Sequence, residues 1–446
     1  MVFSSFTFIL LFLPLVLILV RILLARGKLP FLLAASLLFY GWGNPAWLPL
    51  LVYGILLNYA GGLLLGRCRC KKLLLAVLIL ANLAPLFYYK YAGLFVSTFS
   101  NITGIATAFQ VPLLPAGISF FTFQGLSYLV DVYRGKVGIQ KSPVAFGVYL
   151  SLFPQLVAGP IVRYEDMEAQ LNRLPTLTDK DMLDGLKRFT VGFAKKILLA
   201  DTMGRFCALM QKDPAAAGFL GSWFYLIAFS FQIYFDFAGY SDMAIGLGHC
   251  MGFRWPENFR KPYRASSLTD FWRNWHITLT TWFKEYVYIP LGGSHKGILR
   301  RDLNLLIVWA LTGFWHGAGW HFMLWGLYFG VLLIAEKRLL KTAFYQRIPL
   351  LLRRAATYLM VLVGWGIFTG CDNAFITSAL GGNGFISHQA LVNLASYLPT
   401  ILLCAVTAFA KPIRLPAKKV VLPLLFVLCL CVLAAQSYAP FVYFQF

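Results

Sequence analysis

The side chain best suited to chemistry in this sequence is His316, which stands in the glycine-rich segment WHGAG (315–319). Gly313 and the glycines after His316 let backbone or ligand approach closely, and Trp315 and Trp320 can wall a cavity beside it. A buried neutral imidazole can act as a general base, because burial keeps its pKa near or below neutrality. A histidine hydrogen-bonded across helices fits the same pattern, and both interpretations stay open.

A second histidine, His276, lies in a long basic and aromatic stretch (254–300). Within it the SLTD pattern (267–270) is a capping box, so we expect a helix to begin near Ser267 and to continue past His276 to Trp282. The tryptophans of this stretch are typical of the headgroup level of a membrane. His276 is therefore as consistent with a side chain that faces lipid headgroups as with a catalytic one.

Two carboxylates, Asp236 and Asp242, stand in a long apolar segment, where ionisable groups are costly and are functional candidates by default. Either can pair with an arginine or orient a histidine, and a structural hydrogen bond to a neighbouring helix is equally consistent. His321 follows His316 at a spacing that differs from the i, i+4 spacing of helical zinc ligands. We therefore expect no metal site.

The segment PFVYFQF (440–446) places Tyr443 among three phenylalanines. An aromatic anchor at the membrane interface is the commoner use of such a sequence. The segment could instead enter a pore and present the Tyr443 phenol as a nucleophile. That use requires a neighbouring base, because a phenol with a pKa of about 10 is weakly nucleophilic at neutral pH.

The composition indicates what kind of protein must position these groups. Of 446 residues, 59% are hydrophobic and 13% are charged, and the mean hydropathy is +0.70. Soluble domains average roughly 45–50% apolar and about 25% charged residues. Unbroken apolar runs such as Phe6–Val20 do not resemble the short alternating strands of a membrane barrel. We predict an all-α polytopic membrane protein with one domain over residues 1–446.

The net charge of +22 comes from 39 Lys and Arg residues against 17 Asp and Glu residues. A basic surface can bind nucleic acid, but the positive-inside rule explains the same excess through cytoplasmic loops. We favour membrane topology and expect lipid, not nucleic acid, around the chain. A phosphate-rich small ligand on the cytoplasmic side is compatible with either explanation.

Apolar segments of roughly 20 residues predict the membrane spans. The expected spans are 6–24, 30–43, 47–66, 73–95, 115–133, 182–209, 219–248, 355–370, 388–410 and 419–436. Basic clusters separate them, and if every cluster is cytoplasmic, ten full crossings put both termini on the extracytoplasmic side.

Three further segments do not fit simple spans. Residues 143–160 are apolar but broken by prolines and a glycine, which predicts a re-entrant segment. Residues 302–335 begin and end beside positive charge, which predicts a hairpin that dips into the bilayer and turns at 315–319. The polar segment 163–188 is predicted to be a surface helix on the cytoplasmic face.

The chain resembles the membrane-bound O-acyltransferase (MBOAT) family, and within it the bacterial branch of the alginate O-acetylase membrane component and the peptidoglycan O-acetyltransferase PatA. The resemblance rests on motifs in family order over residues 115–330 and on an F-x-Y-F-x-F ending. The motifs are SFFTFQGLSYLVDVYRG (119–135), FPQLVAGPIVRYEDM (153–167), QIYFDFAGYSDMAIGLG (232–248), NFRKPYRASSLTDFWRNWHITLTTWFKEYVYIPLGG (258–293) and LTGFWHGAGWHFMLWGLYFG (311–330).

This resemblance implies a funnel-shaped helical bundle in a bacterial inner membrane, with a cytoplasmic mouth for an acyl-thioester donor. The family's catalytic histidine matches His316, its second histidine matches His276, and the tyrosine taken as an acyl relay matches Tyr443. Acetyl-CoA is then the expected donor, and an exported serine hydrolase-like transferase would carry the acetyl group to a polysaccharide. The donor phosphates are expected to bind basic residues among Arg254, Arg260, Lys261, Arg264 and Arg273.

Three alternatives remain. D-alanyl transfer for teichoic acid modification occurs in the same family, but in that branch the aromatic tyrosine segment belongs to a separate peptide. A transporter of lipid-linked glycans would explain the broken helices but not the glycine-flanked His316. A scaffold without chemistry explains neither His316 nor the basic mouth.

Overall fold

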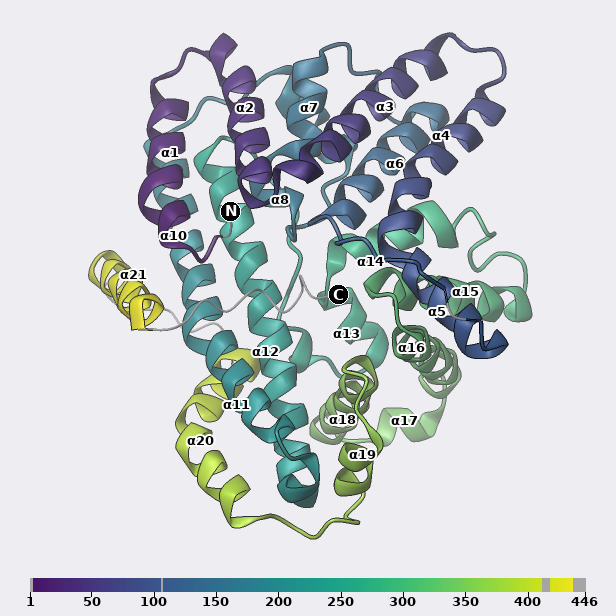
Figure 1. The fold of residues 1–446 in the computed structure, drawn as a ribbon, viewed down its shortest axis with the longest axis vertical. Coiled ribbons are helices and arrows are strands. Elements are labelled where there is room, and N and C mark those ends of the chain that lie inside the picture. Colours follow the sequence, from purple (N-terminus) through teal and green to yellow (C-terminus); the bar gives the residue numbers. More distant parts are fainter. Residues whose placement is uncertain (1–2, 106, 411–417, 436–446) are drawn as a thin grey trace. The chain divides into compact units, whose positions relative to one another are not determined.

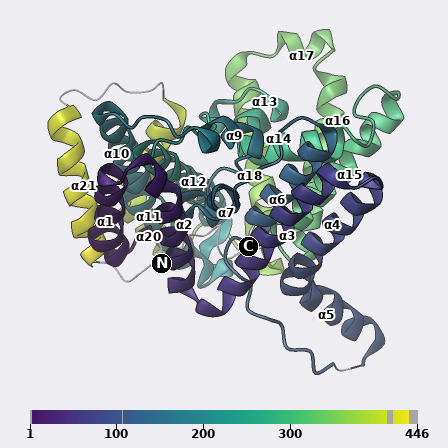
Figure 2. The same cartoon turned by 90° about the horizontal axis from the view of Figure 1, so that it is seen from above.

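The computed structural model describes residues 3–105, 107–410 and 418–435. Every regular element in these ranges is a helix, which confirms the prediction of an all-α protein (Figure 1). In the view turned by 90°, α3, α4 and α6 again lie together, as do α15 and α16 (Figure 2). The predicted tail with Tyr443 lies outside the described residues.

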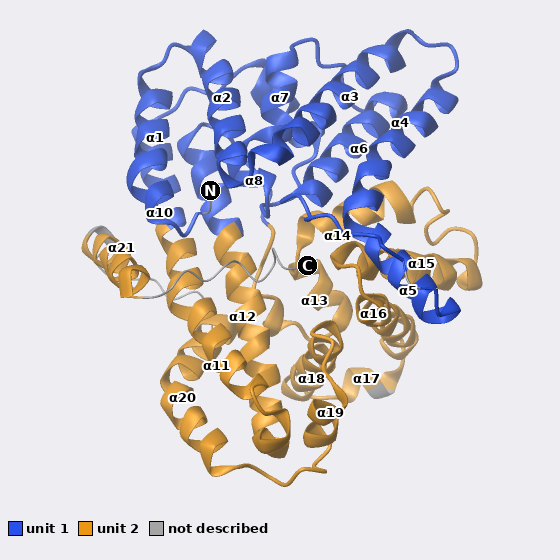
Figure 3. Ribbon diagram, viewed as in Figure 1, with its two compact units in different colours: residues 1–189, 241–257 blue, residues 190–240, 258–446 orange. Residues whose placement is uncertain are grey.

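The chain forms two compact units that interleave along the sequence (Figure 3). Unit 1 comprises residues 1–189 and 241–257, and unit 2 comprises residues 190–240 and 258–446. The helices α10 (Asp179–Ala194) and α12 (Pro214–Cys250) contribute to both units. The prediction of one membrane domain over residues 1–446 stays a prediction.

Unit 1 is built on the packing of α6 against α3 and α4. One side of α6 carries Phe121, Tyr128 and Leu129, all buried, and a Cβ at Gly62 of α3 would collide with the Tyr128 ring. The helices of unit 1 are α1 (Leu13–Ile22), α2 (Ala25–Gly43), α3 (Leu48–Arg67), α4 (Lys71–Leu86), α5 (Ala92–Thr103), α6 (Ile118–Arg134), α7 (Pro143–Ser151), α8 (Phe153–Leu156) and α9 (Tyr164–Asn172).

Unit 2 is centred on a core of aromatic side chains that includes Trp272, Trp325 and Trp365. These rings come from three different helices, so the core ties α13, α16 and α18 together. The helices of unit 2 are α11 (Asp201–Gln211), α13 (Leu268–Asn274), α14 (Ile277–Phe283), α15 (Ile298–His316), α16 (Trp320–Leu339), α17 (Ala343–Arg347), α18 (Leu350–Phe368), α19 (Asn373–Ala379), α20 (His388–Phe409) and α21 (Lys418–Ala435). Short π-helical segments cover Thr7–Phe12, Phe87–Tyr91, Lys195–Ala200 and Lys284–Tyr288.

Five helical runs in the described residues are long and apolar enough to cross a membrane. They coincide with predicted spans 47–66, 73–95, 219–248, 355–370 and 388–410. The runs are Pro45–Arg67, Lys71–Thr103, Pro214–Cys250, Leu350–Phe368 and His388–Phe409. The remaining predicted spans are also largely helical, while the number of crossings and the sides of the two termini stay predictions.

The irregular segments differ in how well they were predicted. The segment 143–160 is broken between α7 and α8, and residues 302–335 form the hairpin of α15 and α16, as expected. That either segment enters the bilayer and returns to the same side stays a prediction. The single surface helix over 163–188 is wrong. Helix α9 ends at Asn172 and α10 begins at Asp179, because Pro175 in the intervening segment lacks the backbone N–H that a continuous helix requires.

Candidate active site

The hairpin of α15 and α16 positions His316 at the last residue of α15. The two helices touch through their backbones, since a Cβ at Gly313 would lie 2.2 Å from the Phe322 carbonyl oxygen. A Cβ at Gly326 would lie 2.1 Å from the Trp309 carbonyl oxygen. Glycine at these crossing points lets the helices approach closely, as predicted for Gly313.

The imidazole of His316 is buried among aromatic rings, with 7% of the residue exposed. Its ring centroid lies 5.0 Å from that of Trp315, 5.0 Å from that of Trp325 and 5.3 Å from that of Phe368. Trp320 is 51% exposed and does not line the pocket described below, so its role as a cavity wall stays a prediction. Further along α16, Trp325 is buried, with 1% of the residue exposed.

His276 occupies a break between two short helices, not the middle of one. Ser267 caps α13 as predicted, accepting a hydrogen bond from the backbone N–H of Asp270 at 3.0 Å. The predicted continuation through His276 to Trp282 is wrong. Helix α13 ends at Asn274, and His276 has a left-handed φ of 43°, which is incompatible with a continuous right-handed helix.

His276 is buried, with 2% of the residue exposed, so it does not face lipid headgroups in the described structure. Its break lies outside the candidate membrane-spanning helices. Burial holds the pKa of His276 well below its ordinary value of 6.5, and the charge of the neighbouring His316 lowers that pKa further. Two cationic imidazoles cannot easily share one buried site, so His276 is neutral at physiological pH.

The side chain of Asn258 holds His276 in place from a loop earlier in the sequence. Its Oδ1 atom lies 3.1 Å from Nδ1 of His276, and it also accepts hydrogen bonds from the backbone N–H and the hydroxyl of Thr278, at 3.3 and 2.9 Å. Two backbone hydrogen bonds join the same two segments. The Ile277 N–H donates to the Asn258 carbonyl oxygen, and the Arg260 N–H donates to the Asn274 carbonyl oxygen. Asn258 is fully buried.

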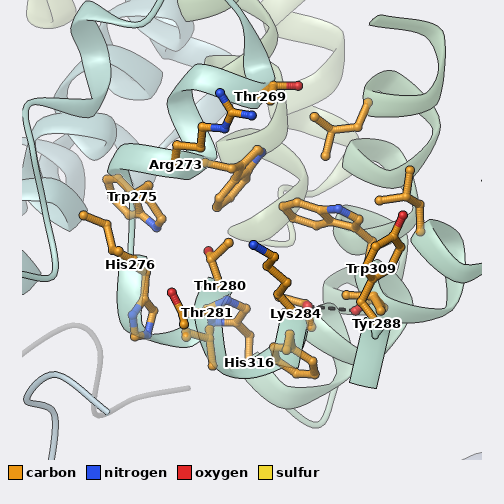
Figure 4. Close-up of a pocket in the computed structure, with 18 of the residues that line it drawn as sticks. Thr269, Arg273, Trp275, His276, Thr280, Thr281, Lys284, Tyr288, Trp309 and His316 are labelled. Atoms are coloured by element: carbon orange, nitrogen blue, oxygen red, sulfur yellow. Dashed lines mark hydrogen bonds between the residues drawn. The ribbon is translucent and has the colours of Figure 1, made fainter. Parts of the chain in front are cut away.

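Both histidines line one pocket of about 470 Å³ within unit 2. This volume falls in the range of small-molecule sites, roughly 300–1,000 Å³. In the view of Figure 4, Arg273 lies toward the top of the pocket and the two histidines lie toward the bottom. The Lys284 ammonium points into the space between Arg273 and the histidines.

Each helix around this pocket contributes one face. From α15 the lining residues follow helical spacing, namely Leu305, Val308, Trp309, Thr312 and His316. The short helix α14 and its π-helical extension contribute a second face. Its lining residues include His276, Thr280 and Lys284, at an i, i+4, i+8 spacing. The pocket therefore combines apolar and aromatic walls with a few polar groups, which is the composition of a typical ligand site.

Among the described residues, three cations line the pocket: Arg273, Lys284 and Lys337. Burial lowers the pKa of Lys337 from its ordinary value of 10.5, and the positive charges of Arg301 and Arg273 add to this effect. Positive side chains gathered in one pocket form a favourable place for an anion such as a phosphate.

Of the five basic residues predicted to hold the donor phosphates, only Arg273 lines the pocket. Arg254 belongs to unit 1, where it forms an ion pair with Asp181. The Lys261 ammonium donates a hydrogen bond of 2.5 Å to the carbonyl oxygen of Ala410. Arg260 and Arg264 flank this segment and do not line the pocket.

The two carboxylates of α12 have structural partners. Asp242 accepts hydrogen bonds from the Arg188 guanidinium at 3.0 and 2.9 Å, which is one of the alternatives that the sequence left open for these carboxylates. Asp236 accepts a hydrogen bond of 2.7 Å from Lys196, which also pairs with Asp201 at 2.7 Å. Neither carboxylate lines the pocket.

No group of three or more His, Cys, Asp or Glu side chains in the described part of the chain is arranged to hold a metal ion.

Sequence inspection missed several residues of this site: Asn258, Lys284, Trp325 and Lys337. It also missed Glu336 of α16, whose carboxylate accepts a hydrogen bond from the backbone N–H of Leu268 in α13. Helical spacing from His276 would have pointed to Lys284, and the spacing from Leu333 to Lys337 is also i, i+4. No sequence signal links Asn258 to His276 or Glu336 to α13, because these contacts join segments that are distant in sequence.

Comparisons with known proteins agree on one family. The model of the membrane-bound O-acyltransferase family matches residues 87–379, which is more than half of the chain. The chain is 36% identical to a probable alginate O-acetylase of Pseudomonas putida over the full length of both chains. It is 35% identical to a peptidoglycan O-acetyltransferase of Helicobacter pylori over 89% of this chain and 82% of that protein. A teichoic acid D-alanyltransferase of Bacillus subtilis is 28% identical over 57% of this chain and 68% of that protein.

Proposed function

The chain belongs to the membrane-bound O-acyltransferase family, and we propose that it takes an acetyl group from cytoplasmic acetyl-CoA and passes it across the membrane for O-acetylation of a polysaccharide. It is an O-acyltransferase and a membrane protein. The observation that carries the proposal is the shared pocket, in which two buried histidines face the same space as Arg273, Lys284 and Lys337. Such a pocket suits an acyl thioester whose far end carries phosphate.

The proposed chemistry uses His316 as the general base. His316 accepts the proton of the attacking hydroxyl, the oxygen bonds to the acetyl carbonyl carbon, and the carbon–sulfur bond breaks. The departing CoA thiolate takes the proton back from His316. Aromatic rings around His316 limit the access of water, which would otherwise hydrolyse the thioester.

The three pocket cations are proposed to hold the donor phosphates, with Arg273 gripping one phosphate bidentately and Lys284 and Lys337 acting as point charges. This assignment replaces most of the residues expected from sequence. The aromatic residues Trp272, Trp275 and Trp309 would then contact the adenine or the pantetheine arm.

The hydroxyl that first accepts the acetyl group is proposed to be that of Tyr443. An acetyl-tyrosine ester on the outer side could deliver its acetyl group to an exported serine hydrolase-like transferase, and that enzyme would modify the polysaccharide. The similar alginate and peptidoglycan O-acetylases support acetyl as the acyl group and a cell-surface or secreted polysaccharide as the final acceptor. The D-alanyl alternative is less well supported, because the similar D-alanyltransferase matches only 57% of this chain.

Intact-mass spectrometry after incubation with acetyl-CoA tests this proposal. Wild-type protein should gain one acetyl group that maps to Tyr443, and Tyr443→Phe should gain none. Tyr438→Phe removes a neighbouring phenol and should be acetylated like wild type. Acetylation that persists in Tyr443→Phe would overturn the relay, and labelling from a D-alanyl carrier protein but not from acetyl-CoA would overturn the donor.

A further inference from the structure

We propose that Asn258 is a positioning residue that fixes the tautomer of His276, leaving the proton on Nδ1 and the lone pair on Nε2. The inference rests on the proposed function, because it assigns His276 a task in acetyl transfer. It concerns a residue 18 positions from His276 in sequence but in hydrogen-bond contact with it.

The identity of the contacting Asn258 atom follows from its other partners. The backbone N–H of Thr278 can only donate, so the atom that receives it at 3.3 Å is the carboxamide oxygen and not the nitrogen. The Thr278 hydroxyl lies 2.9 Å from the same oxygen. A carboxamide oxygen cannot donate, so the Nδ1 atom of His276, at 3.1 Å, must carry the proton.

The surroundings of His276 favour the neutral ring. The imidazole lies edge-on to Phe237 with ring centroids 4.6 Å apart, and it is 2% exposed. A neutral imidazole has one N–H group, so a proton on Nδ1 leaves Nε2 unprotonated.

The backbone around His276 is also held by the Asn258 segment. The left-handed φ of 43° at His276 is unfavourable for a residue with a side chain. The Asn258 carbonyl accepts a hydrogen bond of 3.0 Å from the Ile277 N–H, directly after the strained residue. Asn258 therefore fixes both the backbone and the ring of His276.

This tautomer has a consequence for His316, whose charge interacts with His276. When His316 accepts the proton of the attacking hydroxyl, a positive charge develops in the pocket. A neutral neighbour that presents a lone pair stabilises this charge, whereas a neighbour that presents an N–H group opposes it. Asn258 thus pre-organises the site for the charged state of His316 without touching the donor.

Solid-state NMR of protein labelled with ¹⁵N-histidine in lipid bilayers tests the tautomer without any turnover. His276→Gln identifies the signals of His276 by their loss. Wild-type His276 should show a protonated Nδ1 and an unprotonated Nε2, and Asn258→Leu should lose this preference. Thr278→Val is the matched control, because it removes another donor to the same oxygen and keeps the Asn258–His276 contact.

A protonated Nε2 in wild type, or an unchanged tautomer in Asn258→Leu, would overturn the inference.

Steady-state kinetics provide a second measurement, which a residue with only a packing role would not affect in the same way. Asn258→Leu should lower kcat roughly 10-fold or more and leave the donor KM within about twofold, since Asn258 acts on the barrier and not on donor binding. Asn258→Asp keeps the acceptor oxygen and should retain the proton on Nδ1 of His276. This variant would show that the fold tolerates a substitution at position 258. Because NMR needs no substrate, the tautomer can be established even if acetyl-CoA proves to be the wrong donor.

Discussion

The carboxylate of Glu336 in α16 accepts a hydrogen bond of 2.5 Å from the backbone N–H of Leu268, at the first residue of α13. It also accepts bonds from the backbone N–H and the hydroxyl of Thr269, at 2.8 and 2.6 Å. A buried carboxylate at a helix N-terminus satisfies backbone donors that have no partner within the helix. Glu336 thereby anchors the helix that carries Arg273 into the pocket.

Glu336→Gln should therefore destabilise unit 2. The amide keeps the shape but loses the charge, and hydrogen bonds to charged groups contribute about 1.5–3 kcal/mol each. We expect a lower unfolding temperature in detergent and weaker donor binding. Arg338→Gln is the control: its pair with Asp302 involves an arginine side chain that is 67% exposed, and exposed pairs contribute about 0–1 kcal/mol. Equal stability of the two variants would contradict the anchoring role.

The buried cluster of Lys196, Asp201 and Asp236 is expected to be structural. Lys196→Met would leave two buried carboxylates without their cation, which costs about 3–5 kcal/mol. Thermal unfolding in detergent should reveal this loss, while Lys187→Met, which removes a surface pair with Asp184, should change little. An altered donor KM in the folded fraction of Lys196→Met would contradict this expectation and give Asp236 a role in the pocket.

Donor affinity should depend on the protonation of Lys337. The pKa of Lys337 is lowered from 10.5 by burial and by Arg301 and Arg273, so the ammonium loses its charge at a lower pH than an ordinary lysine. Since phosphate binds the charged form, donor affinity should fall as pH rises through this lowered pKa. The dissociation constant of CoA, measured from pH 7 to 9.5, checks the trend.

Two variants make the Lys337 measurement specific. Lys337→Arg stays charged throughout and should flatten the pH dependence, whereas Lys337→Met should weaken CoA binding roughly 10-fold, or about 1.4 kcal/mol. Lys341→Met changes an exposed lysine outside the pocket lining and should bind like wild type. A Lys337→Met variant with wild-type affinity would remove this residue from the donor site.

The close contact of α15 and α16 makes Gly313 intolerant of a side chain. A methyl group there would lie 2.2 Å from the Phe322 carbonyl oxygen, so Gly313→Ala should separate the helices, displace His316 and reduce both stability and activity. Gly41→Ala is the control, because the nearest atom to its Cβ is a Leu48 methyl at 3.8 Å. Normal folding and turnover of Gly313→Ala would show that the hairpin is not as tightly packed as described.

The parts of this structure that the sequence predicts are those with local causes. Apolar runs predict the spanning helices, and the charges that flank 302–335, with the glycines of WHGAG, predict the hairpin and the place of His316. Ser267 caps α13 through a contact three residues away. In each case the interacting groups are neighbours in the chain or on one helix face.

The parts that could not be predicted depend on contacts between distant segments. The helix break at His276 depends on Asn258, and the anchoring of α13 depends on Glu336. The identity of the pocket cations depends on which faces of α14 and α16 turn inward, so Lys284 and Lys337 were missed and Arg260 and Arg264 were included instead. Aromatic residues occur on both faces of these helices, so the sequence pattern does not indicate which face lines the pocket.

The central claim, that His316 is the base for acyl transfer in this pocket, is tested most directly by the single-turnover release of CoA thiol from acetyl-CoA. Purified wild type should release about one equivalent per protein, and His316→Gln should lower the rate by about 10²–10⁴-fold, the usual contribution of a general base. His321→Gln changes a histidine of the same hairpin that does not line the pocket and should match wild type. Release by His316→Gln at a rate within a few-fold of wild type would contradict the assignment.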